Sequence, residues 1–170
     1  MNRSLKIVVT GPFAAGKTRF IKSISEIDIV TTERKITRRE KGIKRETTVA
    51  MDYGRVTFEN DVLHLYGTPG QIRFEFMWDI LSREMNGFVM LVDATNPDTF
   101  RHARELIDEF LADKPVPYVV AANKQDLAGA PPLAKFRRAM DLPADVLVMP
   151  CVATRKTSVK QVLVQLVDLL

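Results

Sequence analysis

The sequence has one cysteine, one tryptophan and two histidines among 170 residues, and it lacks any long uninterrupted apolar run. A single cysteine, Cys151, excludes an internal disulfide and fits a reducing compartment. A helix that crosses a membrane needs roughly 18 consecutive apolar residues, and no stretch reaches that length. We therefore expect one cytoplasmic domain over residues 1–170, which is long enough to bury a sizeable core.

Targeting signals are also missing from the two ends of the sequence. An apolar run follows the first four residues at once, which leaves no room for a secretory signal peptide, and no glycine follows Met1 for myristoylation. The last residues include no cysteine that could be prenylated. We expect no lipid anchor and no transmembrane segment, so membrane association would require a partner.

The strongest chemical signal is an octapeptide that follows an apolar run at residues 5–9. Residues 11–18 read Gly-Pro-Phe-Ala-Ala-Gly-Lys-Thr, which is the pattern G-x-x-x-x-G-K-[ST]. In this pattern the backbone curls so that successive N–H groups form a nest for phosphate oxygens at a helix N-terminus. The lysine adds a point charge near the β- and γ-phosphates, and the threonine hydroxyl is placed to ligate Mg²⁺. The predicted phosphate-binding residues are Gly11, Ala14, Ala15, Gly16, Lys17, Thr18 and Arg19.

A second motif indicates which base is bound. Residues 123–126 read Asn-Lys-Gln-Asp and follow the apolar run 118–122. Guanine presents an N1–H and a 2-amino group side by side, so the Asp126 carboxylate can accept both hydrogen bonds, whereas adenine would offer it an acceptor. Asn123 can serve the opposite edge of the base, and the aliphatic stem of Lys124 can cover the ring face. The place of this motif at the carboxyl end of a predicted strand favours a guanine site.

These motifs, in this order, make the chain resemble the Ras-like small GTPases over essentially its whole length. Residues 67–71, Gly-Thr-Pro-Gly-Gln, stand where that family carries D-x-x-G-Q, and residues 47–54 resemble a switch I threonine followed by a strand, as in Rab-like members. The variant L-x-G-T-P-G also resembles prokaryotic Rab-like GTPases, including relatives of bacterial polarity and motility regulators. That resemblance implies Roadblock-type dimeric proteins as partners at the switches.

The resemblance also assigns roles to residues that no local pattern would single out. Thr48, with Thr47 as the alternative, is implied to meet Mg²⁺ and the γ-phosphate, and the backbone N–H of Gly70 is implied to meet the γ-phosphate. Gln71 would orient the attacking water. The resemblance thus makes Gln71, Lys17 and Thr48 the catalytic residues, and Thr18 and Thr48 the metal ligands. Residues 151–153 resemble the loop whose backbone reaches the guanine carbonyl, which implies base contacts from Val152 and Ala153.

One departure from the family concerns the metal. Gly67 stands where the pattern requires an aspartate, so the carboxylate that supports Mg²⁺ through a water is missing. We therefore expect weaker Mg²⁺ retention and slow hydrolysis. Asp93, at the end of the apolar run 88–92, is expected to cap its own turn and not to replace that carboxylate.

The alternation of apolar runs predicts an α/β fold with a doubly wound sheet. The resemblance implies the P-loop NTPase class, with a Ras-like six-stranded, mostly parallel sheet, one antiparallel edge strand, and helices on both faces. The predicted strands cover residues 5–9, 49–58, 62–66, 87–93, 118–122 and 146–149. The predicted helices cover residues 17–25, 71–84, 97–112, 132–140 and 158–170.

The stretch 31–46 carries seven basic and three acidic residues, and so holds a charge equal to the net +4 of the chain. No hydrophobic period runs through it, and we expect a long, mobile switch I loop over the nucleotide. The loop could be only a solvated basic segment, could bind a partner, or could supply an arginine finger to the γ-phosphate. Nucleic-acid binding is not expected, because interleaved aromatic residues are missing.

Together these features predict a molecular switch that binds GTP or GDP with Mg²⁺ and hydrolyses GTP to GDP and phosphate. Its switch loops would present a nucleotide-dependent surface to regulators and effectors. Gly67 keeps open a hydrolysis-deficient protein that binds nucleotide as a scaffold. A P-loop kinase is a further alternative, in which the motif at residues 123–126 would be a coincidence.

Overall fold

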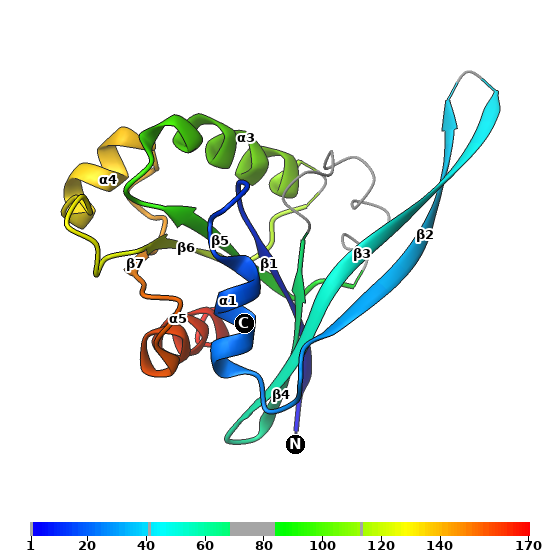
Figure 1. Cartoon of the computed structure of the whole chain (residues 1–170), viewed down its shortest axis with the longest axis horizontal. Coiled ribbons are helices and arrows are strands. Elements are labelled where there is room, and N and C mark those ends of the chain that lie inside the picture. The colour runs from blue at the N-terminus through cyan, green and yellow to red at the C-terminus, as the bar shows by residue number, and fades with distance from the viewer. Residues whose placement is uncertain (1, 41, 69–83, 113) are drawn as a thin grey trace.

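The apolar runs of the sequence form the parallel centre of one sheet in the computed structural model, which describes residues 2–40, 42–68, 84–112 and 114–170 (Figure 1). Unbroken apolar strands are typical of parallel sheets, because helices cover both faces. The parallel strands are β4 (Asp61–Gly67), β1 (Ser4–Thr10), β5 (Gly87–Asp93), β6 (Tyr118–Asn123) and β7 (Val148–Pro150), in that spatial order.

Two further strands, β2 (Val30–Glu40) and β3 (Ile43–Phe58), complete a sheet with the order β2-β3-β4-β1-β5-β6-β7. β3 runs antiparallel to both of its neighbours. The α/β P-loop fold predicted from the sequence is therefore confirmed, with two corrections. The described residues form seven strands instead of six. The antiparallel strand is not at the edge, because β2 lies outside it.

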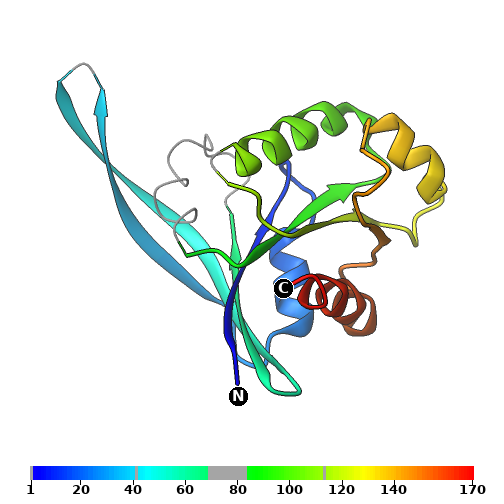
Figure 2. The same cartoon turned by 180° about the vertical axis from the view of Figure 1, so that it is seen from behind.

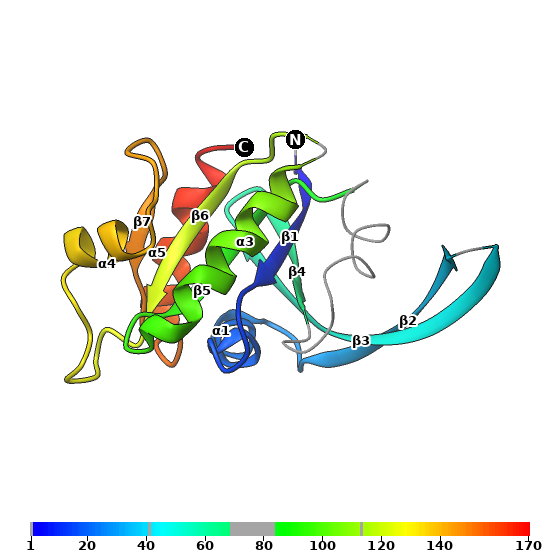
Figure 3. The same cartoon turned by 90° about the horizontal axis from the view of Figure 1, so that it is seen from above.

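The stretch expected to be a mobile loop, residues 31–46, forms most of a β-hairpin, so that prediction is wrong. The pairing runs from Val30 opposite Tyr53 to Glu40 opposite Ile43. Figures 1 and 3 show this ribbon projecting beyond the helices. A strand there has no helix-covered core to face, so it needs no alternation of apolar residues. The stretch is rich in β-branched residues, which favour strands. Gly42 in the turn has a φ of 77°, a left-handed conformation that glycine adopts without strain.

Strand β7 begins two residues later than predicted. The backbone N–H of Val146 bonds the carbonyl of Pro143 in a turn, at 3.2 Å, and so is not available for the ladder. The strand therefore pairs with β6 only from Val148 to Pro150.

Helices cover both faces of the sheet, as Figures 1 and 2 show from opposite sides. They are α1 (Lys17–Ile24), α3 (Phe100–Leu111), α4 (Leu133–Ala139) and α5 (Lys156–Val167), and a 3-10 turn, η1 (Pro97–Thr99), precedes α3. Each α-helix agrees with a predicted one to within a few residues at either end. The helix predicted over 71–84 lies outside the described residues except for Glu84, which is in a turn. No helix in the described ranges is long and apolar enough to cross a membrane.

The core has two layers, and strand β5 divides them. Its side chains alternate, with Phe88, Met90 and Val92 packed beneath α3 and α4, and Val89 and Leu91 packed beneath α1 and α5. All five are fully buried. Burial of a large apolar side chain stabilises the fold by about 1.5–3 kcal/mol. The two layers thus hold the sheet rigid and fix the carboxyl ends of its strands, where the predicted motifs begin.

Candidate nucleotide-binding site

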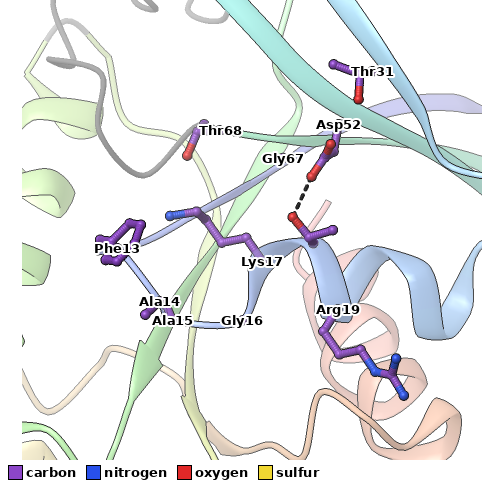
Figure 4. A pocket seen from close by; sticks show the side chains of 11 residues that line it. Phe13, Ala14, Ala15, Gly16, Lys17, Arg19, Thr31, Asp52, Gly67 and Thr68 are labelled. Carbon is purple, nitrogen blue, oxygen red and sulfur yellow. Dashed lines mark hydrogen bonds between the residues drawn. The ribbon is translucent and has the colours of Figure 1, made fainter.

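The loop between β1 and α1 forms the floor of a pocket of about 470 Å³ at the carboxyl edge of the sheet (Figure 4). Residues 13–19 line it from below, and strands β2, β3 and β4 contribute to the rest of its wall. The residues that line it outside the loop are Thr31, Asp52, Gly67 and Thr68. Sequence reasoning missed Phe13, Thr31, Asp52 and Thr68.

Lys17 is held inside this loop by the loop's own backbone. Its Nζ donates hydrogen bonds to the carbonyl oxygens of Gly11, at 2.5 Å, and of Pro12, at 3.1 Å. The side chain is buried, and burial lowers the pKa of Lys17 to about 8. The two carbonyls orient the ammonium group, so the charge predicted to meet the phosphates lies within the pocket.

Asn123 ties three loops together. Its Nδ2 donates a 2.9 Å hydrogen bond to the carbonyl of Ala15, and its Oδ1 accepts one of 2.9 Å from the N–H of Ala153. Gly16 makes this approach possible: its φ is 102°, and a Cβ there would lie 2.7 Å from Nδ2 of Asn123. The phosphate loop, the base motif and the loop after β7 therefore belong to one site.

Lys124 makes a second bridge to the phosphate loop. Its Nζ donates to Oδ2 of Asp93 at 2.8 Å and to the carbonyl of Ala14 at 3.3 Å. Oδ1 of Asp93 accepts from the N–H and the hydroxyl of Thr95, at 2.9 and 2.6 Å. Burial raises the pKa of Asp93, but the hydrogen bonds from Lys124 and Thr95 outweigh this and hold the pKa below its usual value. Asp93 thus caps its turn, as the sequence predicts.

The remaining residues predicted to bind the base lie at the same edge of the sheet. Asp126 is exposed in the turn after Lys124, where its carboxylate is open to solvent. The two N–H groups predicted to reach the guanine carbonyl already have partners. Val152 donates to Oγ of Ser158 at 2.8 Å, and Ala153 donates to Asn123. The loop therefore positions Asn123, and its contact with the base stays a prediction.

Thr18, the predicted metal ligand, contacts a carboxylate that sequence reasoning did not single out. Its hydroxyl donates a 2.6 Å hydrogen bond to Oδ2 of Asp52, drawn as a dashed line in Figure 4. Asp52 lies opposite Gly67 in the ladder of β3 and β4. No group of three or more histidine, cysteine, aspartate or glutamate side chains that could hold a metal occurs in the described part of the chain. A cation here would depend on the oxygens of Thr18, Asp52 and a bound phosphate, which are the hard donors that Mg²⁺ prefers.

The predicted switch residues are not gathered at this pocket. Thr47 and Thr48 lie in β3, paired with Ile36 and Lys35 of β2. Thr48 precedes Asp52 by four residues, a distance of about 13 Å along an extended strand. Gly70 and Gln71 lie outside the described residues.

A phosphate loop after the first strand of a mostly parallel, helix-covered sheet defines the chain as a P-loop nucleotide-binding protein. It belongs to the family described as "Conserved hypothetical ATP binding protein", whose model matches residues 27–170, the part that follows the phosphate loop.

Individual relatives extend this assignment. The chain is 35% identical over 124 residues to the uncharacterized protein MJ1339 of Methanocaldococcus jannaschii, covering 72% of this chain and 71% of that protein. It is 28% identical over 143 residues to human ADP-ribosylation factor-like protein 4C, covering 82% and 70% of the two chains. It is 26% identical over 127 residues to rat ADP-ribosylation factor-related protein 1, covering 71% and 59%. These relatives support the wider Ras-like superfamily and its ADP-ribosylation-factor-like members, and do not support the prokaryotic Rab-like branch.

Proposed function

We propose that this protein binds guanine nucleotide with Mg²⁺ and hydrolyses GTP to GDP and phosphate as a molecular switch. The observation that carries the proposal is the position of Asn123, which bonds the phosphate loop through Ala15 and the loop after β7 through Ala153. A base motif and a phosphate loop joined in this way form one nucleotide site at the carboxyl edge of the sheet, where α/β folds bind ligands.

The choice of guanine rests on Asp126. An exposed carboxylate beyond the end of β6 can accept two hydrogen bonds from guanine, and it would face an acceptor on adenine. The family description names ATP, so the base must be tested directly. The decisive comparison is displacement of fluorescent GDP by unlabelled GTP and ATP. Equal displacement by both would overturn the guanine assignment.

The chain's own residues account for phosphate binding. The backbone N–H groups of the loop and the Lys17 ammonium would hold the β- and γ-phosphates. Thr18 and Thr48 are proposed as protein ligands of Mg²⁺, which when bound neutralises charge that develops on the phosphate oxygens. The Thr18 hydroxyl and the Asp52 carboxylate at the pocket are the hard oxygen donors that such an ion prefers.

For hydrolysis we propose that Gln71 orients the attacking water while Thr48 and the Gly70 N–H meet the γ-phosphate. Thr48 is paired with Lys35 in the β2–β3 hairpin, so it could reach the phosphate only if that pairing changed. We infer that exchange of GDP for GTP rearranges the hairpin. Hydrogen exchange of the backbone amides of β2 and β3, compared between the GDP and GTP-analogue forms, tests this, because broken pairing would speed exchange.

A nucleotide-binding scaffold without hydrolysis is the second candidate, and Gly67 is the observation that favours it. Single-turnover cleavage of bound GTP in Mg²⁺, beside Gln71→Leu and an ATP control, separates the two. Slow cleavage of GTP alone, abolished in the variant, supports the switch. Tight GTP binding without cleavage in either protein supports the scaffold.

The partner class is a separate proposal. The resemblance to prokaryotic Rab-like GTPases implies Roadblock-type dimers, but the relatives do not support that branch. We propose only that regulators or effectors bind the switches, and pulldown from the GDP- and GTP-analogue-loaded forms tests it. Equal recovery of a partner from both forms would contradict a nucleotide-dependent surface.

A further inference from the structure

We propose that Asp52 supplies, from strand β3, the carboxylate that supports Mg²⁺ beside Thr18, in place of the one missing at Gly67. This inference rests on the proposed function, because it concerns the metal that accompanies the nucleotide. It assigns to Asp52 a positioning role at the metal site that the motifs of the sequence do not indicate.

The first argument is the register of two neighbouring strands. Asp52 of β3 lies directly opposite Gly67 of β4. A Cβ built on Gly67 would lie 3.3 Å from Cβ of Asp52. Side chains at the two positions therefore start from nearly the same point of the sheet. A carboxylate from either strand can reach the same end of the pocket.

The second argument is the space around Gly67. Its added Cβ would also lie 2.9 Å from Cδ1 of Ile21, which is fully buried in α1. A side chain at position 67 would have to displace the end of Ile21 and crowd Asp52. The site is built for one carboxylate at this position, and Asp52 already provides it.

The third argument is the hydrogen bond itself. A hydroxyl has one donor hydrogen and two acceptor lone pairs. Because Thr18 donates its hydrogen to Oδ2 of Asp52 at 2.6 Å, its lone pairs are left for a cation. A carboxylate that orients a metal ligand in this way also has lone pairs left to accept from a metal-bound water. Partners of this kind tune metal affinity by roughly 10- to 100-fold.

The fourth argument is charge. Among the described residues that line the pocket, Asp52 is the acidic one, while Lys17 and Arg19 are basic. Asp93, the carboxylate at the end of β5, is engaged by Lys124 and Thr95. Asp52 is therefore the described carboxylate in position to offset the charge of a cation at Thr18.

The test is the Mg²⁺ dependence of GDP release, measured with a fluorescent GDP in the full-length protein. We compare the wild type with Asp52→Asn, which keeps the size of the side chain and an acceptor for Thr18 but removes the charge. We expect the Mg²⁺ concentration that half-slows release to rise about 10-fold or more in Asp52→Asn. The release rate in excess EDTA should match that of the wild type. Asp98→Asn, an exposed site in η1, is the matched charge control and should leave both values unchanged.

A variant that keeps the charge makes the test decisive. Asp52→Glu retains a carboxylate at the same end of the pocket without a side chain at Gly67 that would crowd Ile21, and it should keep Mg²⁺ sensitivity at least in part. An unchanged Mg²⁺ midpoint in Asp52→Asn would overturn the inference. Equal acceleration of GDP release in Mg²⁺ and in EDTA would also overturn it, because the bond between Thr18 and Asp52 would then have a structural role alone. If Mg²⁺ does not slow GDP release even from the wild type, the proposed function itself fails. EPR of Mn²⁺ bound with GDP gives a second readout that requires no turnover.

Discussion

Nδ2 of Asn123 lies 2.9 Å from the backbone carbonyl oxygen of Ala15 and donates a hydrogen bond to it. The two residues are 108 positions apart in the chain. Since Asn123 is buried and also accepts from Ala153, its side chain holds the base motif against the phosphate loop. One amide group thus joins the phosphate loop to the loops after β6 and β7.

Asn123→Ala should destabilise the protein and weaken nucleotide binding together. The substitution leaves the carbonyl of Ala15 and the N–H of Ala153 without their partner, and an unsatisfied buried group costs about 1–3 kcal/mol. Urea unfolding followed by circular dichroism measures the loss. Asn96→Ala is the control, because Asn96 is exposed and makes no side-chain cap bond to η1. Equal midpoints for the two variants would contradict the bridging role.

Gly16→Ala should damage the nucleotide site more than Gly42→Ala. Both glycines have positive φ, 102° and 77°, so both substitutions carry backbone strain of about 1–2 kcal/mol. Only at Gly16 would the new Cβ meet another group, Nδ2 of Asn123 at 2.7 Å, whereas nothing lies within 4 Å of a Cβ at Gly42. We expect Gly42→Ala to keep its affinity for GDP and Gly16→Ala to lose it, as measured by titration calorimetry. The same loss in both variants would show that strain alone is responsible.

Asp126→Asn should reduce affinity for GTP about 100-fold or more without a comparable effect on ATP. Two charge-assisted hydrogen bonds to guanine would be lost, each worth about 1.5–3 kcal/mol. The asparagine can donate to the 2-carbonyl of xanthine, so affinity for xanthosine diphosphate should rise. Asp145→Asn, also exposed, is the charge control. An unchanged ratio of GTP to ATP affinity in Asp126→Asn would show that Asp126 does not contact the base.

Cys151 should resist thiol reagents in the folded protein. Burial raises the pKa of its thiol to about 12, so at pH 8 the reactive thiolate is a fraction of about one in ten thousand. Because Cys151 is the single cysteine, labelling with an aromatic disulfide reports on this thiol alone. We expect no labelling at pH 8 in buffer and one thiol per chain in denaturant. Rapid stoichiometric labelling of the folded protein would contradict the burial of this loop.

Local sequence patterns predicted most elements because those elements depend on local physics. The apolar run of β5 has the bounds expected from it, Gly87–Asp93, and α1 starts at the predicted Lys17. The hairpin of β2 and β3 was missed, because a ribbon outside the helical layers needs no alternation of apolar residues. Its β-branched content and the turn at Gly42 were the available signals.

The sequence by itself determined the class of this protein, because the phosphate loop is one contiguous stretch whose predicted chemistry lies in neighbouring residues. The same is true of the Asn-Lys-Gln-Asp motif. Only the tertiary structure decided which distant groups meet. Asp52 and Thr18 are 34 residues apart, and their contact depends on the register of β3 against β4 and on the packing of α1 beside them. No local pattern encodes a register between strands, since it results from pairing and packing of the whole sheet.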